Sequence, residues 1–163
     1  MGKGDAVVIV HPTNDFDMIR RFMTHPRVWP HISDDGCPDS AQFEPLREGV
    51  LYLAVRNEPN ILGIFLYHPH NSIMAEVHTC MNPMHWGSSV EAGRATLGWV
   101  FDNTNWQKII THVAETNRLA LKLARDVGMT VEGNNRASFL KDGVLLDQYL
   151  LGITKEELCQ QQQ

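Results

Sequence analysis

Residues 73–117 read IMAEVHTCMNPMHWGSSVEAGRATLGWVFDNTNWQKIITHVAETN, and this stretch determines the fold that we predict for the chain. Its first run alternates and is rich in apolar residues, and the breaker Asn82-Pro83 ends it. The predicted elements are a strand, a small-residue turn, a helix, a second strand and a second helix, at residues 73–81, 87–89, 90–101, 108–113 and from 117 onward. The segment therefore predicts a βαβα unit.

The turn at 87–89 reads Gly87-Ser88-Ser89 and leads directly into a predicted helix. The first turn of a helix has backbone N–H groups without intrahelical partners, and the helix dipole is positive at that end. Such a position suits an anionic group, most often a phosphate.

Composition limits the class of protein. A chain of 163 residues suggests one domain that can bury its own core without disulfides. No apolar run is long enough to span a membrane, and the N-terminus lacks a signal-peptide pattern. The net charge of −5 argues against direct nucleic-acid binding. The three cysteines, Cys37, Cys80 and Cys159, favour reduced thiols in a cytoplasm, and we expect a monomer or a homodimer.

Outside this segment the chain alternates short β-type runs with turns. Further strands are predicted at residues 6–10, 49–55, 61–67, 129–132, 137–140 and 144–153. Helices are expected after the Pro12–Asp15 cluster, over a short stretch near Trp29, and from Thr116 as N-cap to Gly128. The tail 154–163 is expected to be helical or frayed. The fold class is therefore α+β: a mostly antiparallel mixed sheet of about seven strands flanked by helices.

The first group of residues that carries a resemblance is Glu76 to Pro83, Gly87-Ser88-Ser89, Glu91-Ala92 and Phe101, and the second is Asn117 to Ala120, Gly128-Met129, Glu132-Gly133 and Asp142 to Asp147. Together they resemble the GNAT superfamily of acyl-coenzyme A N-acyltransferases. The second group is similar to the branch that acylates the N-termini of ribosomal proteins. A narrower likeness, to small GNAT-like proteins of bacteriophages, rests on Thr24 to Pro26, His31 to Gly36, Glu76 to Thr79, Trp86-Gly87 and Phe139 to Lys141. It implies the host cytoplasm as the location.

The resemblance implies one GNAT domain over residues 1–163, a splayed central pair of strands, and acetyl-coenzyme A as co-substrate. In this family the strand before the turn offers backbone groups to the pantetheine arm, the turn amides hold the pyrophosphate, and an asparagine opening the next helix bonds the pantetheine. The matching positions here are Thr79, Cys80 and Met81 for the strand, Trp86, Gly87, Ser88, Ser89 and Val90 for the turn, and Asn117 for the helix.

The sequence departs from the family at two places. The turn has Met84 or Trp86 where Gln or Arg is usual, and it is about two residues short. The tyrosine that often protonates the leaving thiolate corresponds to Ala124. Coenzyme binding is therefore better supported than catalysis.

Acylation of an amine requires removal of a proton from nitrogen, and a carboxylate or an imidazole can accept it. Glu76 and His78 lie two residues apart on one strand, so they share a face and are the predicted bases. The alternative, equally weighted, is that this face points to solvent. His112 on the adjacent predicted strand has two interpretations. It either reaches the binding cleft beside Glu76 and His78, or it is a structural histidine.

The remaining candidates have simpler explanations. Cys80 near the thioester fits a buried hydrophobe better than a nucleophile. The histidines of the first half match no zinc-binding spacing, so no metal is predicted. Asp34 and Asp35 are either contacts for a cationic substrate amine or parts of a solvated acidic loop.

These observations predict an N-acetyltransferase that transfers acetyl directly from acetyl-coenzyme A to an amine of a protein or a small molecule. The alternative is a catalytically weak GNAT-fold phage protein that acts by binding a host or virion protein. The residue Ala124 and the altered turn favour that alternative.

Overall fold

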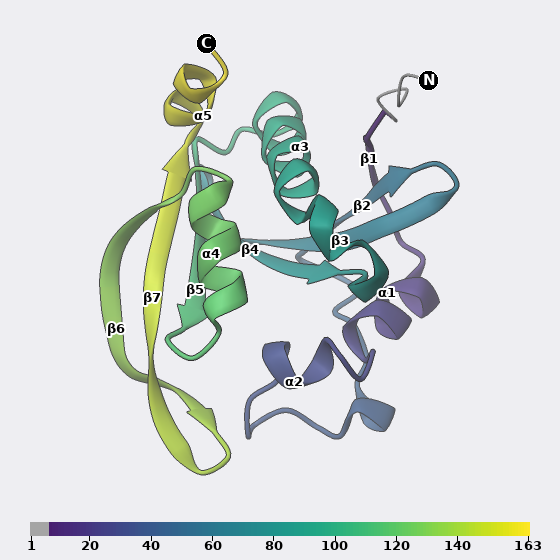
Figure 1. The fold of residues 1–163 in the computed structure, drawn as a ribbon, viewed down its shortest axis with the longest axis vertical. Helices are drawn as coiled ribbons and strands as arrows, with labels where there is room; N and C mark the ends of the chain where they lie inside the picture. The colour runs from purple at the N-terminus through teal and green to yellow at the C-terminus, as the bar shows by residue number, and fades with distance from the viewer. Residues whose placement is uncertain (1–6) are drawn as a thin grey trace.

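The computed structural model describes residues 7–163 and contains a seven-stranded sheet in the order β1-β2-β3-β4-β5-β7-β6 (Figure 1). The strands are β1 Ile9–Pro12, β2 Leu51–Asn57, β3 Asn60–Pro69, β4 Met74–Met81, β5 Lys108–Ala114, β6 Thr130–Lys141 and β7 Val144–Thr154. The helices are α1 Phe16–Met23, α2 Trp29–Ile32, η1 Ser40–Gln42, η2 Pro83–Ser88, α3 Ser89–Asn103, α4 Arg118–Asp126 and α5 Lys155–Gln161. The α+β class, the strand number and the mostly antiparallel order are as predicted.

Strands β4 and β5 form the parallel pair of the sheet, because helix α3 carries the chain across between them. Their register covers three pairs and ends at Glu76 opposite Ile110. Beyond that point the strands separate. The Thr111 hydroxyl donates to the Val77 carbonyl across 3.0 Å, so a side chain, and no longer the backbone, connects the two strands there. This is the predicted splayed pair.

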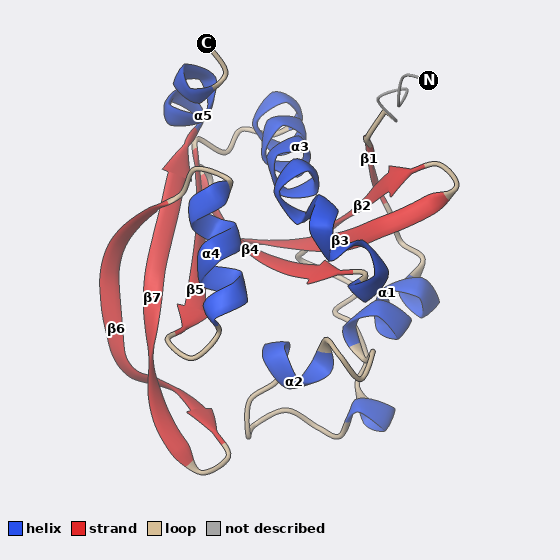
Figure 2. Cartoon of the chain, in the orientation of Figure 1, coloured by secondary structure: helices blue, strands red, loops and turns tan. Residues whose placement is uncertain are grey.

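Helices cover both faces of the sheet (Figure 2). Strand β4 shows the division, because alternate residues point to opposite faces. Val77 and Met81 belong to the larger core, which includes residues of α3, α4 and α5. Cys80 belongs to the smaller core, which includes Met18 and Ile19 of α1. Glu76 and His78 have the parity of Cys80, so they lie on the α1 and α2 side.

Three local predictions were wrong. The first strand is Ile9–Pro12 rather than 6–10, of which Ala6 lies outside the described residues. An edge strand tolerates proline at its end, which the sequence pattern did not favour. Asn117, not Thr116, caps α4, because its side chain accepts from the Ala120 amide. Finally, residues 130–141 form one strand instead of two.

Strand β6 is continuous because a bulge accommodates its polar middle section. Asp147 of β7 accepts hydrogen bonds from the Ala137 amide at 2.8 Å and from Asn134 Nδ2 at 2.9 Å. These bonds hold Ala137 at φ 50°, a value that a non-glycine residue rarely adopts. They also lower the pKa of Asp147. The bulge therefore depends on a residue ten positions away in the chain.

The β6–β7 turn is tied to the loop that follows α2. Asp35 accepts from the amides of Asp142 and Gly143, each at 2.8 Å, and these bonds lower the pKa of its carboxyl. The Lys141 ammonium donates to the Ser33 carbonyl at 2.8 Å. The positive φ angles of Asp142 and Gly143 are those of a tight hairpin turn. We call this set of contacts the clasp.

The chain ends in helix α5, which begins at a capping box formed by Thr154 and Glu157. The tail is therefore helical over 155–161, one of the two forms that we expected. Within residues 7–163 no helix has the length and apolar character needed to cross a bilayer.

Candidate functional site

A cavity of about 460 Å³ lies where β4 and β5 separate, and residues of both sheet faces line it. On the α3 and α4 face the lining includes Thr111, Val113, Asn117, Ala120 and Ala124; we call this part the coenzyme half, after the ligand that the resemblance implies. On the α1 and α2 face it includes Glu76, His78, Tyr52, Phe43 and Leu66; we call this part the acceptor half, after the amine that the resemblance implies. The single cavity therefore reaches both faces of the sheet through the gap between β4 and β5.

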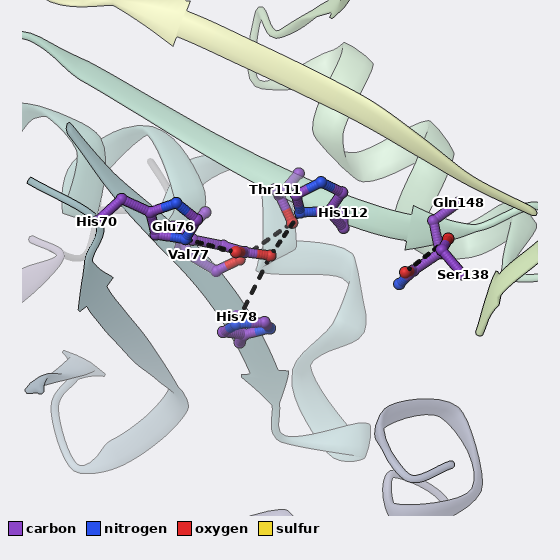
Figure 3. A network of polar contacts seen from close by, with 8 residues as sticks. All are labelled: His70, Glu76, Val77, His78, Thr111, His112, Ser138 and Gln148. Carbon is purple, nitrogen blue, oxygen red and sulfur yellow. Dashed lines mark hydrogen bonds and ion pairs between the residues drawn. The ribbon is translucent and has the colours of Figure 1, made fainter. Parts of the chain in front are cut away.

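A carboxylate surrounded by histidines lies at this gap (Figure 3). Glu76 Oε1 is 2.9 Å from His112 Nδ1, and Glu76 Oε2 is 2.9 Å from His70 Nε2. His78 Nε2 is 3.8 Å from Glu76 Oε1. The Glu76 side chain is only 12% exposed, whereas that of His78 is 50% exposed. The predicted pair thus lines the cavity and does not lie on an outer face.

The surroundings set the charge of both groups. Burial of the Glu76 carboxyl acts to raise its pKa. The hydrogen bond from His112 and the charges of the nearby histidines act to lower the pKa, and their effect is the larger, so the pKa of Glu76 lies below its ordinary value. Loss of solvent around His78 lowers its pKa, and the other histidines act in the same direction against the attraction of Glu76. The site therefore favours an ionised Glu76 beside a neutral His78.

His112 is held by the same carboxylate. An ionised carboxylate only accepts hydrogen bonds, so the proton of a neutral His112 ring lies on Nδ1 and its Nε2 keeps a lone pair. This arrangement of a carboxylate and an imidazole is the one by which enzymes orient a base. His112 joins the site, as one of our two interpretations allowed.

Three of the predicted coenzyme contacts line the cavity: Thr79, Cys80 and Asn117. Asn117 has a structural role as well, since its Oδ1 accepts from the Ala120 amide at 3.2 Å. Cys80 is buried, and burial raises the pKa of its thiol to about 12, so it stays a neutral hydrophobe as expected. Met81 is buried in the larger core and does not line the cavity.

The predicted turn differs from an open loop. Trp86, Gly87 and Ser88 belong to the 3-10 helix η2, and Ser89 begins α3, followed by Val90. In a 3-10 helix an amide bonds to the carbonyl three residues earlier, so fewer amides are free than in a loop. The Ser89 hydroxyl also donates to the Trp86 carbonyl at 2.6 Å. None of these five residues lines the cavity.

The region around the turn at residues 86–90 still has open space, and a positively charged side chain lies beside it. A Cβ atom added to Gly87 would meet no heavy atom within 4 Å. The Arg27 guanidinium lies over the Trp86 ring at 4.6 Å from its centroid, a cation–π contact at an exposed position. Sequence reasoning did not connect Arg27 with this turn, because the two are almost sixty residues apart.

Two further observations concern proton donors. Ala124 is buried and lines the coenzyme half, so no hydroxyl stands where the family often has tyrosine. Tyr67 also lines the cavity, and its hydroxyl is the one buried side-chain polar atom of the described residues without a hydrogen-bond partner. Burial raises the pKa of Tyr67, so this group remains a neutral phenol.

Of our two interpretations of Asp34 and Asp35, the structure favours the acidic loop, because both carboxylates accept hydrogen bonds from backbone amides. Asp35 is bound to the β6–β7 turn in the clasp, and Asp34 accepts from the Gly36 amide at 2.9 Å. Sequence reasoning also missed the contact of His70 with Glu76. The two residues lie six positions apart across a turn, and only the return of the chain into β4 brings them together. Among residues 7–163, no group of three or more His, Cys, Asp or Glu is arranged as a metal site.

Solved structures of acetyltransferases have the same fold. A spermidine N-acetyltransferase from Vibrio cholerae, in complex with CoA and spermine, aligns with a TM-score of 0.79 and 19% identity over 93% of this chain and 98% of that chain. A chimera from Vibrio cholerae and hSSAT aligns with a TM-score of 0.78, 19% identity and the same coverage. A probable acetyltransferase aligns with a TM-score of 0.59 and 16% identity over 67% of this chain and 64% of that chain. At these identities the likeness shows the GNAT fold alone.

The sequence has no match among curated proteins. Residues 10–163 match a family that is described as a protein of unknown function, DUF2824, and the match covers nearly the whole described chain. The chain is therefore a member of the DUF2824 family, and its fold is that of the GNAT acetyltransferases.

Proposed function

We propose that this protein is an acyl-coenzyme A-dependent N-acetyltransferase that transfers acetyl directly to an amine of a protein or a small molecule. The observation that carries the proposal is the Glu76–histidine network at the wall of a cavity that opens between the splayed strands. The fold supports it, since similar solved structures include an acetyltransferase crystallised with CoA. The resemblance to phage proteins extends the proposal to a phage-encoded protein in the cytoplasm of its host.

Acetyl-coenzyme A would lie in the coenzyme half, with its pantetheine arm along the backbone of Thr79 and Cys80 and beside Asn117. Its pyrophosphate would lie at Gly87–Val90, before the first turn of α3, where the helix dipole favours negative charge. Arg27 adds a guanidinium at the same corner, which is the residue type best suited to phosphate. The open space around Gly87 leaves room for the ligand.

The reaction requires a neutral amine nitrogen on the acceptor side. Its lone pair attacks the thioester carbonyl carbon, the new C–N bond forms, and the C–S bond breaks as coenzyme A leaves as a thiolate. The proton of the amine passes to a base in the cavity wall, and the thiolate takes up a proton from water, because Ala124 has none to give.

His78 is the best candidate for the base. Its lowered pKa keeps the ring neutral near pH 7, whereas the lowered pKa of Glu76 makes that carboxylate a weak proton acceptor. Glu76 instead orients His112 and His70 through its two oxygens. Of the two residues predicted from the sequence, we therefore assign proton removal to His78 and positioning to Glu76.

Calorimetric titration with acetyl-coenzyme A tests coenzyme binding, with Gly87→Glu as the variant. The Cβ atom of a glutamate at this position meets no heavy atom within 4 Å, and the side chain adds bulk and negative charge at the proposed pyrophosphate position. Gly98→Glu is the matched control, since Gly98 lies in the following helix α3 and a Cβ atom added there also meets no heavy atom within 4 Å. We expect binding by the parent and by Gly98→Glu, and a loss of at least about tenfold in affinity for Gly87→Glu. Equal affinity for all three proteins places the pyrophosphate elsewhere.

A second function has specific support. The closed η2 turn and Ala124 both depart from an efficient acetyltransferase, and they favour a protein that keeps the fold but binds a host or virion protein. Absence of any heat with acetyl-coenzyme A, in a folded parent protein, decides for this second function. Binding together with acetyl transfer decides for the enzyme.

A further inference from the structure

The acceptor half of the cavity is mainly apolar and aromatic. The side chains that form it come from α1, α2, the loop that follows, two strands of the central sheet and the β6–β7 hairpin: Met23, Ile32, Phe43, Tyr52, Leu66 and Phe139. The Phe43 ring is itself fixed against Trp29, with centroids 5.1 Å apart. Such a lining binds apolar ligand surface and gives orientation through a few polar groups.

The charged groups around the cavity are few and already paired. Among the described residues that line the cavity, the carboxylates are those of Glu44 and Glu76, and no Asp, Lys or Arg is present. Glu44 lies 3.6 Å from Arg20 and 4.0 Å from Arg47. Glu76 is bonded by two histidines. No unpaired carboxylate therefore faces a second positive charge on a ligand.

On the basis of the function proposed above, we propose that the acceptor is a primary monoamine whose remaining part is apolar, with an aromatic group favoured, and that polyamines are poor acceptors. A second ammonium group in this cavity would lose water without gaining a partner, which is costly. The reacting amine benefits from the same surroundings, because an apolar site disfavours the ammonium form and leaves the nucleophilic neutral amine.

The test compares four amines in acetyl transfer: butylamine, phenethylamine, 1,4-diaminobutane and spermidine. Butylamine and 1,4-diaminobutane have the same carbon chain and differ by one charge, so they isolate the effect of that charge. We expect kcat/KM for butylamine to exceed that for the diamine by roughly tenfold or more, because the diamine brings an unpaired charge into the site. Phenethylamine should be the best of the four. A diamine or spermidine that reacts as well as butylamine overturns the inference.

A substitution at the rim of the cavity can supply the missing carboxylate partner for a second ammonium group. Leu46 lines the cavity and is 55% exposed, so it lies at the rim and tolerates a polar side chain. Leu46→Glu should raise the ratio of kcat/KM for the diamine over butylamine several-fold, whereas Leu46→Gln, of the same size and without charge, should leave the ratio near that of the parent. Equal ratios in the two variants contradict the argument from charge.

Binding of the four amines in the presence of coenzyme A, followed by NMR signals of the His78 ring, separates this inference from the proposed function. Stronger binding of phenethylamine and butylamine than of the diamines supports the inference even in a protein that transfers no acetyl group. Equal or stronger binding of the diamines overturns it, and so does the absence of binding by all four amines. Failure of the proposed function alone shows instead as the absence of acetyl-coenzyme A binding and transfer.

Discussion

Replacing Glu76 by glutamine tests how the carboxylate controls the histidine that we assign as base. The substitution keeps the size of the side chain and removes its charge. His78 Nε2 lies 3.8 Å from Glu76 Oε1, and the carboxylate acts to raise the pKa of His78 against the effect of burial. Glu76→Gln should therefore lower the pKa of His78 further.

The distance gives the size of the effect. Two unit charges about 4 Å apart interact by about 1 kcal/mol at the dielectric of water and by about 4 kcal/mol at an effective dielectric of 20. The His78 side chain is 50% exposed, so solvent screens it and the lower part of this range applies. An interaction of about 1–2 kcal/mol corresponds to roughly one pKa unit.

The assay is an NMR titration of the imidazole signals in the parent, in Glu76→Gln and in the control Glu44→Gln. Glu44 is the other carboxylate of the cavity, but it pairs with Arg20 and takes no part in the histidine network. The titration of His78 should move to lower pH in Glu76→Gln alone, and the acidic limb of kcat/KM should move with it. A His78 titration that stays in place or moves to higher pH refutes the reasoning.

Four further outcomes are expected. Asn117→Asp keeps the acceptor that caps α4 and removes the amide donor, so it should weaken coenzyme binding while the melting temperature stays near that of the parent; Asn117→Ala should also cost about 0.5–2 kcal/mol of stability in denaturant titrations. Tyr67→Phe removes a buried hydroxyl without a partner, so stability by denaturant titration should stay equal or rise, whereas lower coenzyme affinity would identify the hydroxyl as a ligand contact. Acidification should destabilise the protein without ligand, because the pKa values of Glu76 and His78 are lower in the folded protein, so the unfolded chain binds more protons than the folded one. In thermal melts, stability should fall below about pH 6.5, the ordinary pKa of histidine, and fall again below about pH 4.5, the ordinary pKa of glutamate. Asp35→Ala should speed amide exchange in the β6–β7 turn relative to the sheet, and unchanged exchange there would show that the clasp adds no local stability.

The fold could be predicted from the sequence where local signals are strong. Alternation in 73–81 and 108–113, with a helical pattern between them, gave the parallel pair and the crossover helix. Strand β6 could not be predicted as one element, because Asp147 on the neighbouring strand holds its bulge. The signal for η2 was present and misinterpreted: Asn82 caps it through the Met84 amide and Pro83 takes its first position, a pattern typical of a helix start.

The candidate site could be predicted only in part. Two-residue spacing placed Glu76 and His78 on one face, but spacing does not say which face is covered. Cys80 points to the same face as Glu76 and His78 and packs against residues of α1. This packing shows that their face of the sheet is covered. The partners His70 and His112 come from a turn and from the next strand, so their contacts with Glu76 exist only once β3, β4 and β5 are assembled. Tertiary contacts of this kind have no signature in a single sequence.

The clasp also has a consequence for the order of folding. Its hydrogen bonds join residues 107 and 108 positions apart, the largest sequence separations among the side-chain hydrogen bonds of the described residues, so they raise the contact order of the chain. Closing so long a loop costs chain entropy before any bond forms, and such contacts form late. During synthesis the chain reaches the end of β5 well before the turn at Asp142 exists. A nascent chain therefore has strands β1–β5 before it has the β6–β7 hairpin, and Phe139 is the last of the apolar side chains to join the acceptor half.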